Sequence, residues 1–223
     1  MLGFHNYPTL NIGEFAIKSG VTTSSVGRFQ FQIRGKGVHA AKPEQGNDSV
    51  VVVGQLINSL QTIISRNLSA FDNAAVTIGE ISCDNTWNVI ADKAYIQGTV
   101  RSYSEDKRQY IEDRMKNIDD GLSQAFNFDI YFSYSRIPGA VVNDKYLTKL
   151  AIEVAKEVEY HVSILDEPLT IGEDFSGYTR EYPGVFAFIG SNSKYDLHHP
   201  KYHPDERILE KSPNISYNSF NVY

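Results

Sequence analysis

The sequence is short of three features that often fix the class of a protein: cysteine, long apolar runs and an excess of positive charge. The single cysteine, Cys83, excludes an intramolecular disulfide and favours a reducing compartment, so we expect a cytoplasmic protein. No stretch approaches the roughly 18 apolar residues of a membrane-spanning helix, and polar residues interrupt the best candidate, residues 49–64. We therefore expect no membrane partner.

The charge balance argues against a nucleic-acid partner. There are 27 acidic and 21 basic residues, which gives a formal net charge of −6 at pH 7, whereas a nucleic-acid-binding surface needs a basic face. Hydrophobic residues make up 41% and charged residues 22% of the 223 positions, as in ordinary globular proteins. This length suits one large domain or two modest ones.

The middle of the chain alternates between strand-like and helix-like patterns. Residues 28–34 alternate strictly between polar and apolar side chains, which predicts a half-buried strand. The same reasoning predicts strands at 73–82, 89–103 and 128–134, with helices after Asn47 or Asp48 and after Ser104. The resulting β-α-β-β-α-β order is the ferredoxin-like pattern, a four-stranded antiparallel sheet with two helices on one face.

The two flanking segments, 1–25 and 139–223, do not easily make one independent core, so we interpret them as two pieces of another domain. A third helix is predicted to begin at Asp144, and buried strands are predicted at 162–165 and 185–189. We expect an α/β fold in which a ferredoxin-like domain is inserted into a second domain. The predicted boundaries are 1–25 and 139–223 for the interrupted domain and 26–138 for the inserted one. The polar stretch after Lys211 is expected to be frayed.

Histidine is the residue type that carries most of the chemical information. Six are present, and neutral imidazole is both a common metal ligand and a general acid or base near neutral pH. His161 follows a predicted helix and His203 lies in a polar stretch, so both are interpreted as surface residues. The other four lie in loops beside predicted strands, where sites are usually placed.

Six short strings in this sequence follow motifs of one known family in the same order. They are GFHNYPTLNIG (3–13), GKGVHAAKP (35–43), NVIAD (88–92), GTVR (98–101), GEDF (172–175) and LHHP (197–200). Together they resemble the aminoacylase/carboxypeptidase-like metallopeptidases. The resemblance is to the amidohydrolase branch, which includes hippurate hydrolase, N-acetyldiaminopimelate deacetylase and auxin-conjugate hydrolase.

The resemblance implies a site that binds two divalent ions, zinc or manganese. His5 matches one histidine ligand of the family and His198 another, with His199 left as an alternative to His198. Without the surrounding string, His5 would be interpreted as a flexible terminal residue. The implied substrate is a small amide, such as an N-acyl amino acid, hydrolysed by metal-activated water.

The resemblance also implies two polar groups that act across a homodimer interface formed by the lid, residues 26–138. His39 and Asn88 match the lid residues that donate hydrogen bonds to the oxyanion in the partner's site. A turn residue before a strand is the alternative for Asn88. Glu173 is expected near the substrate or, equally, as a helix cap with Asp174. Arg101 is expected to form a surface ion pair rather than to contact substrate.

Several family motifs have no counterpart in this sequence. The C-x-H or H-x-D ligand motif, the G-H-D-x-H string and the E-E pair with the general base are all missing, and Cys83 lies inside the lid pattern. His5 and His198 are far fewer than the about four ligands of a stable zinc site. We therefore expect a truncated amidohydrolase that is inactive alone. The alternative is a non-catalytic dimerisation fragment or a pseudogene product.

Overall fold

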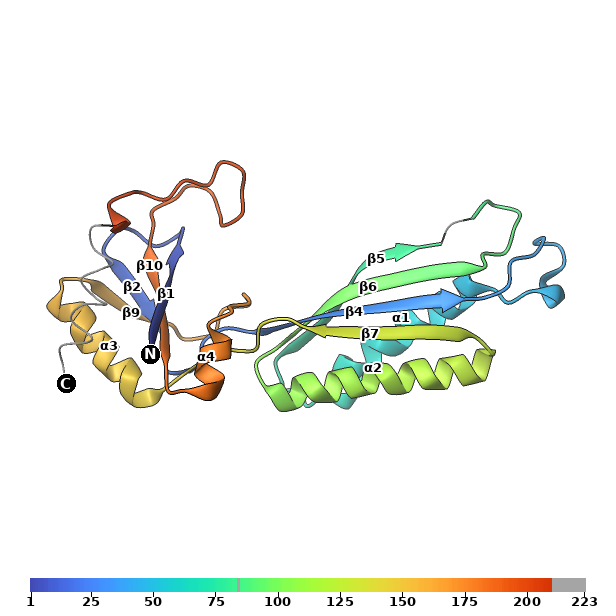
Figure 1. Ribbon diagram of the computed structural model, residues 1–223, viewed down its shortest axis with the longest axis horizontal. Coiled ribbons are helices and arrows are strands. Elements are labelled where there is room, and N and C mark those ends of the chain that lie inside the picture. The colour runs from blue at the N-terminus through green and yellow to red at the C-terminus, as the bar shows by residue number, and fades with distance from the viewer. Residues whose placement is uncertain (84, 210–223) are drawn as a thin grey trace. The chain divides into compact units, whose positions relative to one another are not determined.

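The computed structural model describes residues 1–83 and 85–209, which form two compact units (Figure 1). Unit 1 contains Met1–Ser24 and Pro138–Tyr223, and unit 2 contains Ser25–Ile137. Both units combine helices with a sheet, so the predicted mixed α/β class is confirmed. The expected frayed stretch after Lys211 lies outside the described residues. Across the described ranges, no helix is long and apolar enough to cross a membrane.

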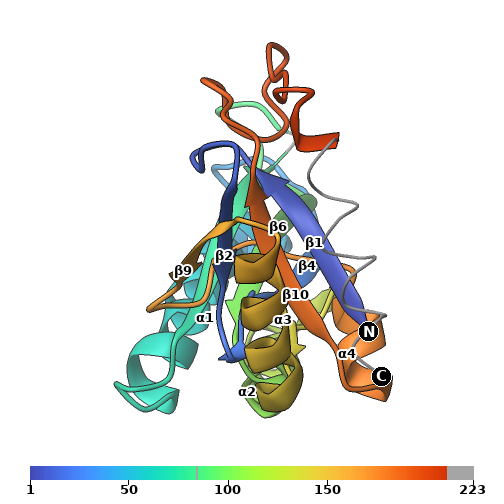
Figure 2. The ribbon, with the colours of Figure 1, turned by 90° about the vertical axis from the view of Figure 1, so that its left-hand side faces the viewer.

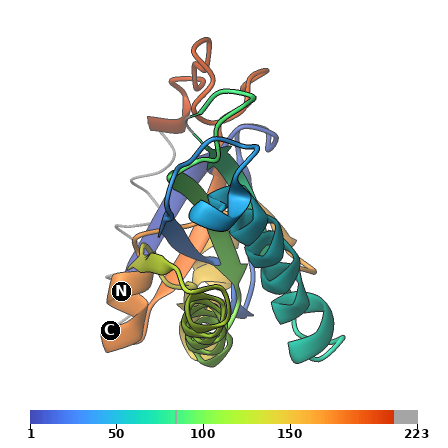
Figure 3. The ribbon, with the colours of Figure 1, turned by 90° about the vertical axis from the view of Figure 1, so that its right-hand side faces the viewer.

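Unit 2 is a four-stranded antiparallel sheet covered by two helices. Its strands are β4 (Ser25–Arg34), β5 (Ala74–Ser82), β6 (Lys93–Ser102) and β7 (Asp129–Arg136), in the spatial order β5-β6-β4-β7. Helices α1 (Ser49–Asn67) and α2 (Glu105–Phe126) lie on the same face of this sheet (Figure 3). The opposite face of the sheet carries no helix.

The alternation in β4 explains why the sheet has one covered and one open face. Phe29, Phe31 and Ile33 are fully or almost fully buried against the helices, whereas Arg28 and Gln32 point to the open face. Successive strand residues face opposite sides, so one face becomes apolar and the other polar. The apolar face packs against inward residues of both helices, among them Val52, Leu56, Leu60, Ile63, Ile111 and Met115.

The two helices of unit 2 begin differently. Asp48 is the N-cap of α1, and its carboxylate accepts a hydrogen bond from the Val50 amide at 2.9 Å. Ser104 occupies the N-cap position of α2, but its side chain makes no capping hydrogen bond. Phe126 is the last helical residue and is 38% exposed.

Unit 1 is a mixed four-stranded sheet with the order β1-β10-β2-β9. The strands are β1 (Leu2–Tyr7), β2 (Glu14–Ile17), β9 (His161–Ile164) and β10 (Val185–Gly190). β1 and β10 are parallel, β2 runs antiparallel to β10, and β9 is parallel to β2. Helix α3 (Lys145–Glu157) crosses one face of this sheet (Figure 2). It begins after Asp144, whose side chain accepts from the Leu147 amide at 2.8 Å.

Shorter elements complete the two units. In unit 1, β3 (Gly20–Val21) pairs with β8 (Val142–Asn143), and α4 (Ser176–Glu181) follows Phe175. In unit 2, a 3-10 turn spans Pro43–Gln45. The Phe175 ring packs with Phe186 and Phe188 in a cluster separate from that beneath α3. Unit 1 therefore has apolar clusters on both faces of its sheet.

Candidate functional site

The loops that carry His39 and Asn88 pair with each other at the end of unit 2, just beyond β4 and before β6. His39 forms an isolated bridge with Val89, the Ala40 amide donates to the Asn88 carbonyl at 3.0 Å, and the Ile90 amide donates to the Val38 carbonyl at 2.8 Å. These bonds join two loops that are 49 positions apart in the sequence. The fold thus brings the two loops that carry His39 and Asn88 together through their backbones.

The hydrogen bond at the His39 ring determines where a neutral imidazole carries its proton. His39 Nδ1 accepts from the Ala41 amide at 3.1 Å, so this nitrogen must be unprotonated in the neutral ring. The proton is then on Nε2, which is free to donate because the His39 side chain is exposed. Asn88 is half-buried, and its side-chain amide supplies another neutral donor.

In unit 1, His5 is close to an acidic pair from a different part of the chain. His5 Nδ1 donates to the neighbouring Asn6 carbonyl at 2.7 Å, which leaves Nε2 unprotonated in the neutral ring. Burial raises the pKa of the Glu173 carboxyl, and a hydrogen bond with the Asp174 side chain adds to the rise. The Phe175 amide, 3.4 Å from Glu173 Oε1, and the charge of His5 lower this pKa.

Close packing explains why glycine precedes His5 by two positions. A Cβ at Gly3 would come within 2.6 Å of the Phe175 ring, so any larger residue would displace this ring or the strand. Phe175 directly follows the Glu173–Asp174 pair, so its contact with Gly3 holds that loop against β1. Glu173 Oε1 accepts a long hydrogen bond from the Phe175 amide just before α4, although α4 itself has no side-chain cap.

His198 lies in the loop after β10 and has a left-handed backbone conformation, with φ of 66°. This conformation is uncommon for residues other than glycine and needs support from surrounding contacts. Tyr202 supplies one contact: its hydroxyl donates to Asn6 Oδ1 at 2.6 Å and contacts Ser191 Oγ at 3.1 Å. Tyr202 therefore ties the His198 loop to the strand that carries His5.

The neighbouring histidines have their own partners. His199 Nδ1 accepts from the Lys201 amide at 3.0 Å, and its ring stacks on Tyr195 with a centroid separation of 4.5 Å. His161 is exposed at the start of β9, and His203 Nδ1 lies 2.9 Å from the Pro204 carbonyl. The surface interpretation of the last two histidines agrees with these positions.

The described residues do not make a complete metal site. Over 1–83 and 85–209, no three His, Cys, Asp or Glu side chains are grouped so that they could hold a metal ion. One nitrogen of the His5 ring is held by a backbone carbonyl, as is common for histidines that bind metals through the other nitrogen. A stable site nevertheless needs about four donors, and this part of the chain does not bring them together.

Three residues of the described chain were missed or misjudged from the sequence. The role of Tyr202 could not be predicted from the sequence, because its hydrogen-bond partner Asn6 lies 196 positions away. Trp87 precedes Asn88 and is 93% exposed, which leaves a large apolar side chain in solvent beside the paired loops. The expected ion pair of Arg101 is absent among the described residues. Its guanidinium donates to Thr99 Oγ1 and the Val100 carbonyl.

A hydrogen-bond network covers the open face of the unit 2 sheet. Gln97 Oε1 accepts from Arg28 at 2.6 Å, from the Tyr95 hydroxyl at 2.7 Å and from Gln30 at 3.3 Å. The Gln97 side-chain nitrogen donates to Glu80. The Gln97 side-chain amide therefore links β4, β5 and β6, and its nitrogen is hydrogen-bonded to the Glu80 carboxylate. The open face is thus polar and ordered by cross-strand contacts.

Comparison with known proteins gives consistent results along the chain. Residues 21–120 match the model of the M20 peptidase dimerisation domain. The chain is 36% identical over 219 residues to N-acetyl-L-cysteine deacetylase of Bacillus subtilis, covering 98% of this chain and 52% of the relative. It is 34% identical over 213 residues to N-acetyldiaminopimelate deacetylase of Bacillus cytotoxicus, covering 95% and 56%.

Solved structures show the same relationship. A putative aminohydrolase from methicillin-resistant Staphylococcus aureus superposes with a TM-score of 0.87 at 30% identity, covering 96% of this chain and 57% of that one. A Bacillus subtilis protein described as a dinuclear metal-binding peptidase of the M20 family gives 0.76 at 29%, covering 98% and 55%. Over nearly its whole length, this chain is therefore similar to amidohydrolases of the M20 family. It spans about half the length of these relatives.

Proposed function

We propose that this chain is the lid-bearing part of a metal-dependent amidohydrolase that cleaves N-acyl amino acids or similar small amides. The similarity to two deacetylases over nearly the whole chain carries this proposal. Unit 2 would be the ferredoxin-like lid, residues 26–138, inserted between catalytic-domain pieces 1–25 and 139–223. The two compact units and the β5-β6-β4-β7 order support this division. A cytoplasmic location would suit the single cysteine.

His39 and Asn88 would stabilise the oxyanion that forms when water adds to the amide carbonyl. Both present neutral N–H donors, and the Ala41 amide fixes the His39 proton on Nε2. A neutral donor that faces the developing negative charge lowers the barrier without competing for a metal ion. Removing one such donor typically costs about 100- to 1,000-fold in kcat.

His5 and His198 would be the two metal ligands that this chain contributes, and Glu173 would lie near the substrate. The oriented His5 ring and the Tyr202 tether support their placement on one side of unit 1. The described donor set is too small to hold two ions, so the remaining ligands and the general base would have to come from additional residues. We therefore expect the 223-residue chain alone to be inactive.

The lid would pair two copies of the protein through its α1 side. Val50, Val51 and Gly54 are exposed on the outer surface of α1, and the stretch from Ser49 to Ser65 contains no charged residue. β5 lies at one edge of the sheet, so its outer backbone groups have no partner strand in the described protomer. An uncharged surface beside an unpaired strand is self-complementary, as the two-fold symmetry of a dimer requires.

The test is to join this chain to the N-terminal half of the Bacillus subtilis N-acetyl-L-cysteine deacetylase and measure acetate release from N-acetylcysteine. The hybrid is expected to hydrolyse the substrate when zinc or manganese is added, and the 223-residue chain alone is not. His39→Ala in the hybrid should lower kcat by about 100-fold or more. A folded, metal-loaded hybrid without turnover of any N-acyl amino acid would contradict the proposal.

The second candidate is a non-catalytic dimerisation module. It is favoured by the incomplete donor set among the described residues and by the match of residues 21–120 to the dimerisation domain. This function predicts a stable dimer of the isolated chain, and it predicts no hydrolysis by any hybrid. The hybrid assay therefore separates the two functions.

A further inference from the structure

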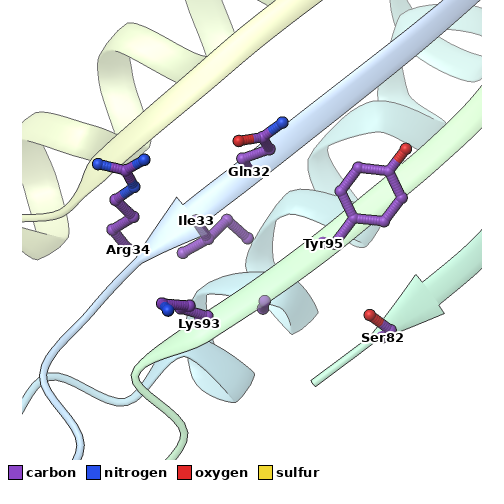
Figure 4. Close-up of a pocket in the computed structure, with 7 residues that line it drawn as sticks. Gln32, Ile33, Arg34, Ser82, Lys93 and Tyr95 are labelled. Carbon is purple, nitrogen blue, oxygen red and sulfur yellow. The ribbon is translucent and has the colours of Figure 1, made fainter. Parts of the chain in front are cut away.

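The open face of the unit 2 sheet contains a hollow of about 530 Å³ near the end of β5. Seven residues from three strands line it: Gln32, Ile33, Arg34, Ser82, Lys93, Ala94 and Tyr95. Figure 4 shows Gln32 and Tyr95 on adjacent strands, with Arg34 and Lys93 close to the strand ends. Ser82 is the last residue of β5, so the hollow opens where this strand stops.

Two cations, Arg34 and Lys93, are among the residues that line this hollow. Arg34 and Lys93 are direct register partners in the antiparallel pair of β4 and β6. Their side chains leave the same face of the sheet, since partners in such a pair point the same way. Like charges at opposed positions repel each other and destabilise a sheet. This arrangement therefore favours a bound negative charge between the two side chains.

No described carboxylate forms an ion pair with either cation. None lies within 4 Å of the Arg34 or Lys93 nitrogens in residues 1–83 and 85–209. Asp129 is the register partner of Arg34 on its other side, but it forms no ion pair with it. The Glu80 carboxylate, also on β5, accepts from Gln97. By contrast, cations on the helix side of unit 2 are paired, such as Lys107 with Asp72 and Arg108 with Glu105.

The surroundings of the two cations would orient an acidic ligand. The Arg34 guanidinium lies 4.8 Å from the centre of the Tyr131 ring, which holds its position without using its N–H groups. Gln32, Tyr95 and Ser82 lie in one cross-strand row beside the cations. They add the Gln32 amide and the Ser82 hydroxyl, and the Tyr95 hydroxyl, which donates to Gln97, can still accept a hydrogen bond from the polar body of a small molecule.

We infer that this hollow binds the acidic group, carboxylate or phosphate, of a small molecule. Arg34 and Lys93 hold the anion, and the row from Gln32 to Ser82 contacts the rest of the ligand. This site goes beyond the proposed hydrolysis, because neither His39 nor Asn88 lines the hollow. Its existence therefore does not depend on the amidohydrolase proposal.

The experiment is an NMR titration of the isotope-labelled 223-residue chain with two probes, inorganic phosphate and citrate, at low ionic strength. We expect saturable shifts of the amide signals at 32–34, 82 and 93–95, which weaken when salt screens the cations. The double substitution Arg34→Gln with Lys93→Gln should weaken binding at least about tenfold. Tighter binding of phosphate assigns the site to phosphate esters, and tighter binding of citrate assigns it to carboxylates.

A matched control removes the same charge elsewhere. Lys116→Gln with Lys145→Gln takes two positive charges from exposed helix positions and should change the affinity less than about twofold. Glycerol, a neutral probe, should give no saturable shift at the hollow. Equal weakening by the two double variants, or no saturable shift with either anion, would overturn the inference.

Discussion

Helices α1 and α2 cover the same face of the same sheet, yet their outer surfaces are chemically opposite. α1 carries one charged residue, Arg66, in 19 residues, whereas α2 carries six acidic and four basic residues in 22. The β7 strand beside α2 extends this difference, because its Arg136 pairs with Glu112 of α2 at 2.7 Å. The inner surfaces of both helices share one apolar core.

The difference shows which side of unit 2 can be dehydrated with a small loss of free energy. Charged groups are expensive to dehydrate unless each finds a partner, so the α2 side is suited to remain in solvent. Uncharged side chains and exposed valines can be covered by another surface, because the cores of interfaces are depleted in charge. The packing of the core does not explain this asymmetry, whereas the proposed contact on the α1 side would explain it.

The largest expected effect comes from a charge placed on the outer surface of α1. A Cβ added at Gly54 or at Gly121 of α2 would meet no atom within 4 Å, so both positions accept a side chain in the protomer. Gly54→Lys should weaken the dimer at least about 100-fold, near 3 kcal/mol, because the charge must be buried. Gly121→Lys should leave it unchanged. Sedimentation equilibrium measures the dimer dissociation constant of each variant. Equal dissociation constants would contradict the proposed difference between the outer surfaces of α1 and α2.

The next effect concerns a buried acid in α2. Asp119 is 7% exposed, its Oδ1 has no partner among the described residues, and burial raises its pKa to about 6, with a further rise from Asp120. The folded state then holds this proton more tightly than the unfolded chain does. Asp119 therefore destabilises the fold as pH rises from about 4 through about 6.

Asp119→Asn should consequently stabilise the protein by about 2 kcal/mol at pH 8 and by little below pH 4. Denaturant unfolding at the two pH values measures the difference. Asp120→Asn is the control on the exposed side of the same helix and should change stability far less. A pH-independent effect of Asp119→Asn would show that this carboxyl is not held in its neutral form by the fold.

A smaller effect distinguishes the starts of the two helices. Asp48→Ala removes the carboxylate that accepts from the Val50 amide and should cost about 1 kcal/mol of unfolding free energy. Ser104→Ala should cost much less, because the Ser104 side chain makes no capping bond in α2. Urea unfolding measures the free energy of unfolding of both variants. A larger loss of stability from Ser104→Ala than from Asp48→Ala would contradict this prediction.

The smallest expected effect concerns an ion pair on the charged side of unit 2, between α2 and β7. Glu112→Gln removes the carboxylate that Arg136 contacts, and we expect a loss of about 0.5 kcal/mol, because both side chains are partly exposed. The loss should shrink at high salt, which screens surface pairs. Thermal unfolding at low and high salt measures it. A loss that does not depend on salt would indicate a packing role for Glu112 instead.

Local patterns predicted the parts of the fold that are determined by neighbouring residues. The strict alternation at 28–34 reflects the two faces of β4, and Asp144 is followed by α3 as expected. β1 was not predicted, because all six of its residues are half-buried and show no alternation. It becomes a strand by parallel pairing with β10, more than 180 positions away. Such non-local pairing leaves little trace in a short segment.

The candidate site was accessible from the sequence only through the family motifs. Nothing local links His39 to Asn88, since the ladder beyond β4 and β6 brings them together. The orientation of the His39 and His5 rings depends on single hydrogen bonds with backbone groups, which the residue types do not reveal. The open hollow beside Arg34 and Lys93 arises because β5 ends at Ser82, a boundary that folding determines.

The most direct test of the proposed lid function is subunit complementation between two inactive hybrids. One hybrid carries His39→Ala and the other carries His5→Ala, and the two are mixed under conditions that exchange subunits. If His39 acts in the partner's site, about one quarter of the unmutated activity should return, because half of the dimers are mixed and each holds one intact site. Mixed dimers that remain inactive would contradict action across the interface.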